Sequence, residues 1–244
     1  MTGRGRRGKE KSCRTIIWLH FCLPSVSSWS CKLRRSWVAF LSPFCTWIPP
    51  SYVKRPLMSF SGDAVHAGTL LIAPPLSDDP NFRRTVVLVC EHNEEGSFGL
   101  ILNRELTLYL GDVLEELASY TAPLSLGGPV QQNTLHVLHR FGDGVPESTR
   151  IAEGVYWGGD FDAIQEIVQT GRGDSRELRF FLGYSGWTSG QLTQEVELGG
   201  WILSEADSES VFPPDQEGLW RVVLRRMGGE YAVLANFPDD PRLN

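Results

Sequence analysis

The chain has 244 residues, five cysteines and a formal net charge of −6, but this average hides two oppositely charged parts. Residues 1–57 carry eleven Lys or Arg against one acid, whereas residues 58–244 carry twelve arginines, no lysine and 28 acids, a net charge of −16. The acidic part argues against direct binding of nucleic acid, because phosphate backbones are held by clustered cations. Its 187 residues are enough for one domain with a substantial core.

Residues 1–57 lack helical or strand periodicity, and we expect them to lie outside the domain as a disordered leader or as the product of an upstream start site. A secretory signal fits poorly, because its apolar stretch is short and interrupted by His20, while an Arg-rich, acid-poor start also resembles a transit peptide. A membrane-spanning helix would need about 20 consecutive apolar residues, and residues 1–57 contain no such run. We favour translation from Met58, which leaves Cys90 as the only cysteine and fits a reducing cytoplasm.

Hydrophobic periodicity and turn residues predict the elements of the acidic part. Short β-branched runs indicate strands buried on both faces, and three prolines indicate a loop between the first two strands. Because the strands occur in clusters, with helices between and after them, the pattern favours an α+β fold. In chain order we expect strands at 68–73, 85–90 and 97–103, a helix at 111–119, a strand at 133–140, a helix at 161–169 capped by Asp160, a strand at 176–184 and a helix at 215–227.

The stretch from 183 to 203, GYSGWTSGQLTQEVELGGWIL, is the most distinctive part of the chain. Thr188 and Gln191 have the spacing of a capping box, so we expect a short helix to begin at Ser189 and to stop at Gly199 and Gly200. The turn before this helix is expected to expose Trp187.

Ser185 lies in a near match to the nucleophile elbow of hydrolases. The elbow needs glycine two residues before and two residues after the nucleophile, and Trp187 occupies the second position. Ser185 is therefore a poor nucleophile, and we assign no catalytic residue.

Metal and phosphate sites are also incomplete. His136 and His139 are three apart, which points them to opposite faces of a strand, and Cys90 with His92 would share a face but supply only two of the three or four ligands of a zinc site. The glycines Gly127 and Gly128 match no phosphate-binding motif, and we expect them to form a sharp turn with positive φ. We therefore expect no metal and no cofactor.

Spaced blocks of distinctive sequence run along the acidic part: GTLLIAPPLSDDPNF, VVLVCEHNEEGSFGLILNR, LGGPVQQNTLHVLH, LGYSGWTSGQLTQEVELGGWIL and LANFPDDPRLN. In this order they resemble the YqgE/AlgH family over about residues 66–244. Ser97, where alanine is more usual, and the leader depart from the family pattern. The resemblance implies a single compact α+β domain with a strongly bent, partly buried sheet and several short helices, in the cytoplasm, and a role as a transcriptional regulator rests on the family name alone.

The polar and aromatic residues of these blocks allow two interpretations. They are either scaffold that closes the open end of the sheet, which we favour, or the lining of one ligand cleft. The leading function is a non-enzymatic binding or regulatory protein that acts through a protein or small-ligand partner; the alternative is a hydrolase or transferase that uses His92, His139 or Glu195 as acid or base. The cleft candidates are His92, Asn103, Gly127, Gly128, His139, Tyr184, Trp187, Gln191 and Glu195.

Overall fold

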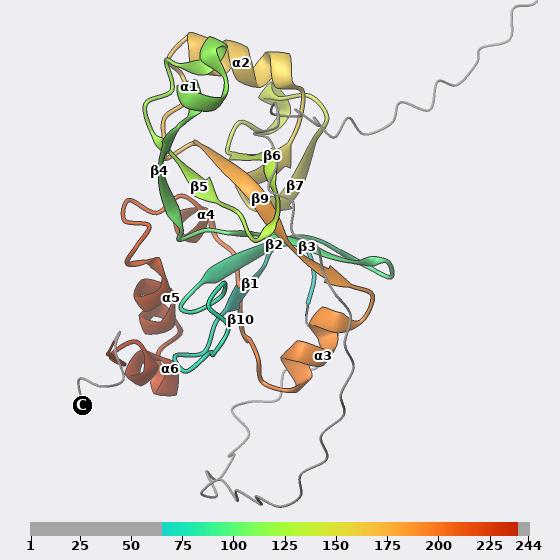
Figure 1. Ribbon diagram of the computed structural model, residues 1–244, viewed down its shortest axis with the longest axis vertical. Helices are drawn as coiled ribbons and strands as arrows, with labels where there is room; N and C mark the ends of the chain where they lie inside the picture. The colour runs from blue at the N-terminus through green and yellow to red at the C-terminus, as the bar shows by residue number, and fades with distance from the viewer. Residues whose placement is uncertain (1–64, 239–244) are drawn as a thin grey trace, which may run out of the picture.

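The computed structural model describes residues 65–238, so the expectations for the leader and for Met58 lie outside the described residues. The chain forms one curled sheet with short helices around it (Figure 1), which confirms the α+β fold with a bent sheet. The strands are β1 (Thr69–Ile72), β2 (Val86–Asn93), β3 (Gly96–Ile101), β4 (Glu105–Tyr109), β5 (Pro123–Leu126), β6 (Val130–His139), β7 (Ser148–Ala152), β8 (Val155–Gly158), β9 (Leu178–Thr188) and β10 (Ile202–Glu205).

The helices are short, and the longest two, α2 and α5, have nine residues each. Within residues 65–238 no helix has the length and apolar character needed to cross a membrane. In chain order the helices are α1 (Leu110–Val113), the 3-10 turns η2 (Glu115–Leu117) and η3 (Gly142–Gly144), α2 (Phe161–Gln169), α3 (Gln191–Glu197), α4 (Ser208–Val211), α5 (Leu219–Met227) and α6 (Gly229–Leu234).

Strand β9 joins the two halves of the sheet. The strand order is β10-β1-β2-β3-β9-β6-β8-β7, while β4 pairs with β5 and β5 lies parallel to β9. Residues 178–184 of β9 pair with β6, and residues 185–188 pair with β3. In Figure 1 β9 crosses the centre of the molecule, with β4, β5, α1 and α2 in the upper half and β1, β10, α3, α5 and α6 in the lower half.

Alternate side chains of β1 and β2 enter two different cores. Leu70 and Leu88 belong to an inner cluster with Phe181 and Trp220. Leu71 belongs to a second cluster beneath α3, with Trp187, Trp201 and Leu203. Both strands are therefore buried on both faces, as their continuous apolar runs predict.

The helix expected at 111–119 is wrong in extent. Strand β4 precedes it, with an alternating pattern of exposed and half-buried residues, and only α1 and η2 are helical. Leu114 separates these two turns because its backbone is extended, with φ −134° and ψ 102°. Strands β5, β7 and β8 and helices α4 and α6 were also not expected.

Helices α2 and α5 differ in how well their starts follow from the sequence. The carboxylate of Asp160 accepts the N–H of Ala163 at 2.9 Å, which confirms the predicted cap of α2. The helix expected from Asp215 begins instead at Leu219, because Asp215 accepts the N–H of Gly218 at 3.1 Å and holds a turn there.

Glycine is required at positions 127 and 128 because their backbone lies very close to that of β9, rather than because of the expected sharp turn. A Cβ on Gly127 would lie 2.2 Å from the carbonyl oxygen of Gly183, and one on Gly128 would lie 2.2 Å from that of Tyr184. Gly127 does not have the expected positive φ, whereas Gly128 does, with φ 159°. The pair is therefore needed because the backbone after β5 runs directly against β9.

Candidate functional site

Glu195 on α3 is the centre of the distinctive stretch. Its Oε2 accepts the indole N–H of Trp187 at 2.9 Å and that of Trp201 at 2.8 Å, and its Oε1 accepts an amide N–H of Gln191 at 3.0 Å. Trp187 is 6% exposed. The expectation that a turn exposes Trp187 is wrong, because β9 continues to Thr188 and carries the ring beneath α3.

The start of α3 also differs from the capping-box prediction. The N–H of Thr188 donates to Oε1 of Gln191 at 3.1 Å, so that contact exists, but Gly190 is left-handed with φ 71° and the helix begins at Gln191 rather than at Ser189. The predicted stop is confirmed. The N–H of Gly199 donates to Val196 and that of Gly200 to Glu195, the two hydrogen bonds of a Schellman motif.

Phe82, from the loop between β1 and β2, completes an aromatic group around Glu195. Its ring centroid is 6.1 Å from that of Trp187 and 5.4 Å from that of Trp201. Indole N–H groups in partly buried sites need acceptors, and both of these converge on one carboxylate oxygen. Trp187, Gln191 and Glu195 are therefore brought together, with their polar atoms engaged in holding α3 to the sheet.

His92 lies on the same face as Trp187, because His92 pairs with Ser97 and Ser97 pairs with Trp187 across neighbouring strands. His92 Nδ1 is 2.7 Å from Ser97 Oγ. Cys90 does not share this face as expected, because the strand register shifts between Val89 and Glu91 and places Cys90 in the inner cluster. Cys90 and His92 therefore do not form the pair on one strand face that the sequence suggested, and burial raises the pKa of the Cys90 thiol.

His139 is fully buried at the other end of β9. It pairs with Leu178, nine residues from Trp187, which corresponds to about 30 Å of extended strand. Its Nδ1 accepts the N–H of Phe141 at 3.3 Å and its Nε2 contacts the carbonyl oxygen of Gly158 at 3.1 Å, an arrangement that suits a neutral ring protonated on Nε2. Burial lowers the pKa of His139, although the Gly158 contact opposes this.

Tyr184 lies apart from both the Glu195 group and His139, in an aromatic cluster inside the curl of the sheet. Its ring stacks on Phe98 at 4.9 Å, and Phe98 also contacts Trp157 at 4.9 Å and His136 at 5.1 Å. Burial lowers the pKa of His136 to about 4. The structure thus groups His92, Trp187, Gln191 and Glu195, leaves Tyr184 beside Gly127 and Gly128, and holds His139 apart from both.

Asn103 holds strand ends and also reaches a cleft. Its Oδ1 accepts the N–H of Val86 at 2.9 Å, and its Nδ2 donates to the carbonyl oxygen of Arg84 at 2.8 Å. The cleft has a volume of about 280 Å³ and lies between the β3–β4 connection and the start of α5. Its lining residues are Arg84, Asn103, Arg104, Glu105, Glu217, Trp220 and Arg221.

Sequence reasoning missed this cleft because its arginines come from three distant segments. One signal was present: Arg84 precedes β2 and Arg104 follows β3, and an antiparallel pair places those two ends side by side. The structure confirms this proximity, because Arg104 Nη2 donates to the carbonyl oxygen of Arg83 at 2.6 Å. Arg84 also has a left-handed backbone, with φ 55°.

Arg179 lies directly behind the cleft and is 3% exposed. Its Nη2 donates to the carbonyl oxygen of Leu102 and to Gln216 Oε1, both at 2.7 Å, and its Nη1 donates to the carbonyl oxygen of Val211 at 2.7 Å. Burial lowers the pKa of Arg179 to about 10, so the group stays charged at neutral pH. This guanidinium ties the segment before α5 to the sheet.

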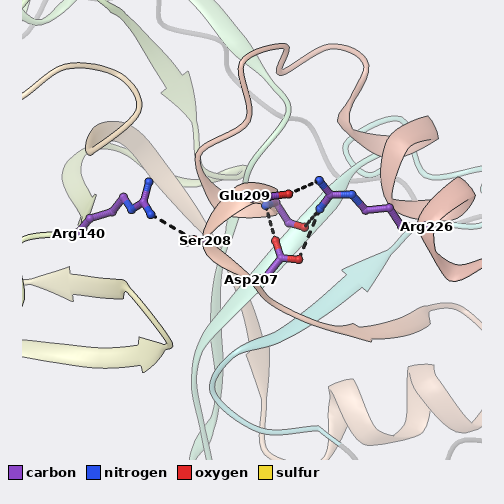
Figure 2. Close-up of polar contacts among 6 residues, drawn as sticks. Arg140, Asp207, Ser208, Glu209 and Arg226 are labelled. Carbon is purple, nitrogen blue, oxygen red and sulfur yellow. Dashed lines mark hydrogen bonds and ion pairs between the residues drawn. The ribbon is translucent and has the colours of Figure 1, made fainter.

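The same segment also has surface contacts with two arginines, Arg226 and Arg140, which Figure 2 shows. Arg226 pairs with Asp207 at 3.4 Å and with Glu209 at 2.7 Å, and Arg140 donates to the hydroxyl of Ser208 at 3.3 Å. Exposed ion pairs contribute about 0–1 kcal/mol each. Buried Arg179, rather than these surface contacts, therefore dominates the placement of the cleft wall.

A second hollow, of about 510 Å³, lies on β7 and β8 and is lined by Asp143, Glu147, Arg150 and Tyr156 among others. Among the described residues, no group of three His, Cys, Asp or Glu side chains is arranged to hold a metal ion.

Known proteins match most of the chain. A UPF0301 protein of Cytophaga hutchinsonii is 46% identical over 178 residues, which cover 72% of this chain and 98% of the relative. A UPF0301 protein of Chlorobaculum tepidum is 44% identical over 177 residues, with 72% and 95% covered.

Solved structures agree with these relatives. A crystal structure of a Corynebacterium diphtheriae protein has a TM-score of 0.61 at 27% identity, covering 71% of this chain and 93% of that one. The solution structure of AlgH from Pseudomonas aeruginosa has a TM-score of 0.56 at 31% identity, covering 70% and 94%. The family model described as AlgH-like matches residues 70–232. The chain therefore belongs to the AlgH-like family.

Proposed function

We propose that this chain is a non-enzymatic regulatory protein of the cytoplasm that binds a small ligand in the cleft at the start of α5. One observation carries the proposal. Residues 65–238 contain eleven arginines against 25 acids, yet three of those arginines line a single cleft of about 280 Å³. The lining also includes Glu105 and Glu217, so the cleft keeps a net positive charge, and a concave, positively charged surface with the amide of Asn103 beside it is typical of ligand sites.

The bonding of the sequence candidates supports a non-enzymatic role. Both carboxylate oxygens of Glu195 accept hydrogen bonds from the scaffold, and the buried Ser185 hydroxyl donates to the carbonyl oxygen of Gly127 at 3.2 Å. His92 and His139 lie on separate parts of the sheet. A general acid or base must reach the reacting proton with its partner groups nearby, so this spacing disfavours a hydrolase or transferase that uses His92 and His139 together.

Charge favours a small ligand over DNA. A surface with 25 acids repels a phosphate backbone at long range, whereas one cationic cleft can still hold a compact ligand. We propose that any regulation of genes by this chain is indirect and proceeds through this ligand or through a protein that senses the ligand-bound form.

Nuclear magnetic resonance of the full chain, labelled with nitrogen-15, tests the site. A panel of neutral, cationic and anionic metabolites should contain a ligand that shifts the amide resonances of residues 103–105 and 217–221 in a saturable way. The control region is α3, residues 191–197, whose amides should not move. Saturable shifts confined to α3 and His92 would move the site to the tryptophan group, and an absence of saturable shifts across the panel would contradict the proposal.

A further inference from the structure

The geometry points to a compact oxyanion, a phosphate group either free or on a small monoester, as the ligand of this cleft. This inference rests on the proposed function, because it assigns a chemistry to the site proposed there. Two arginines, one helix end and the size and bonding of the cleft favour this ligand.

Arg104 is the cation most directly available to a ligand. It is half-buried, and one guanidinium N–H donates to the carbonyl oxygen of Arg83 at 2.6 Å. Within residues 65–238 no carboxylate forms an ion pair with Arg104. A guanidinium has five N–H donors in a planar fork that matches the oxygens of phosphate, so Arg104 keeps donors and net charge for a ligand.

Arg179 adds a second positive charge from behind the cleft. Its partners are carbonyl, hydroxyl and amide oxygens, none of which carries a full negative charge. Two of those partners, Leu102 and Gln216, directly precede the lining residues Asn103 and Glu217. In that part of the chain which the structure describes, Arg179 has no ion-pair partner and its Nε has no hydrogen-bond acceptor. Since burial weakens screening by water, its field reaches the cleft.

Helix α5 begins at the cleft and favours negative charge there. The first turn of a helix presents unpaired N–H groups and a partial positive charge. The N–H of Trp220 has no acceptor among residues 65–238. Carbonyl oxygens of the following segment hold two guanidinium groups of the lining in place: Arg84 donates to Phe237 at 2.9 Å, and Arg221 donates to Phe237 at 3.3 Å and to Ala235.

The cleft selects for a compact ligand rather than an aromatic one. Its volume of about 280 Å³ is at the lower limit of pockets for drug-sized molecules. The Trp220 ring is not available for stacking, because it is 2% exposed, Arg84 lies over it at 4.8 Å and its Nε1 donates to the carbonyl oxygen of Ala73 at 2.8 Å. Recognition therefore depends on charge and hydrogen bonds, which a phosphate group offers in a small volume.

Titration calorimetry of the full chain, with chloride replaced at constant ionic strength, tests the inference. Inorganic phosphate and glycerol phosphate are the two probes, and they separate the free ion from the monoester. We expect saturable binding of at least one probe, a loss of about tenfold or more in affinity for Arg104→Gln, and a gain of several-fold for Glu217→Gln, which removes an exposed negative charge from the lining. Arg225→Gln and Glu230→Gln make the same charge changes at exposed positions outside the lining and should leave the affinity unchanged.

The inference is overturned if neither probe binds the wild-type chain saturably, or if Arg225→Gln weakens binding as much as Arg104→Gln does. A melting curve shows whether Arg104→Gln is folded, and Glu217→Gln keeps the test decisive if it is not, because the gain in affinity requires a folded cleft. If a neutral metabolite shifts the amide resonances of the cleft and phosphate does not, the proposed function is supported and the inference of an oxyanion ligand is wrong. If no probe or metabolite binds in the cleft, both the proposed function and the inference of an oxyanion ligand are wrong.

Discussion

Glu195 shows how one side chain defines the distinctive stretch. A carboxylate on α3 accepts two indole N–H groups from residues before and after the helix, so it joins β9, α3 and the start of β10. The sequence indicated a helix here and placed Gln191 and Glu195 one turn apart, but it could not indicate that both tryptophans turn inward. That outcome involves Phe82 from a distant loop, whose ring contacts both indoles, while the indoles also contact each other edge to face at 6.1 Å.

Replacing Glu195 by alanine should destabilise the protein by about 3 kcal/mol, because two partly buried indole donors lose their acceptor at about 1–3 kcal/mol each. Glu195→Gln keeps one acceptor oxygen and should cost about 1 kcal/mol. Urea unfolding followed by tryptophan fluorescence measures both. Glu197→Ala, at an exposed position of the same helix, should change stability by less than about 0.5 kcal/mol, and an equal loss in both alanine variants would refute the role of Glu195.

At the scale of elements, the sequence predicted what local patterning controls. The strands with continuous apolar runs, the Asp160 cap of α2 and the glycine stop of α3 were all confirmed. Strands β7 and β8 were missed because STRIA and VYWG are too short to show a period, and they become strands only by pairing with each other and with β6. The arginine cleft was missed for the same reason, since Arg84, Arg104 and Arg221 meet only after the sheet and α5 have packed.

Gly127→Ala tests the close approach between β5 and β9. A Cβ placed 2.2 Å from the carbonyl oxygen of Gly183 forces two backbones apart, so we expect a loss of about 3 kcal/mol or more. Gly171→Ala is the matched control, because Gly171 has φ 68° but nothing within 4 Å of its added Cβ. It should cost only about 1–2 kcal/mol, the strain of a left-handed residue. Thermal unfolding compares the two, and a larger loss for Gly171→Ala would contradict our explanation of Gly127.

For the whole molecule, buried neutral histidines make stability depend on pH. The folded pKa of His136 is about 4, below an unfolded value of about 6.5, because burial disfavours the charged ring. Between these values the unfolded chain binds more protons, so the stability from this group is complete above about pH 6.5 and is lost as pH falls toward 4. The loss amounts to about 3 kcal/mol at most, and His139, whose pKa is also lowered, acts in the same direction.

Urea midpoints measured from pH 7.5 down to 4.5 should therefore fall steeply in the wild-type chain. His136→Gln removes the titrating ring and should flatten this dependence, even if its stability at pH 7.5 is lower. An unchanged slope in His136→Gln would show that carboxylates, rather than this histidine, govern the acid response.

Because β9 belongs to both halves of the sheet, neither half of the molecule can fold without it. Residues 178–184 complete the pairing of β6, and residues 185–188 complete that of β3, so a fragment that ends before β9 lacks the central strand of both halves. Neither half can then be expressed or transferred to another gene as an independent unit. A chain nicked in the exposed stretch around Asp143 should instead reassemble from its two pieces, because the cut falls in the turn after β6 and leaves β9 and the strands that pair with it uncut.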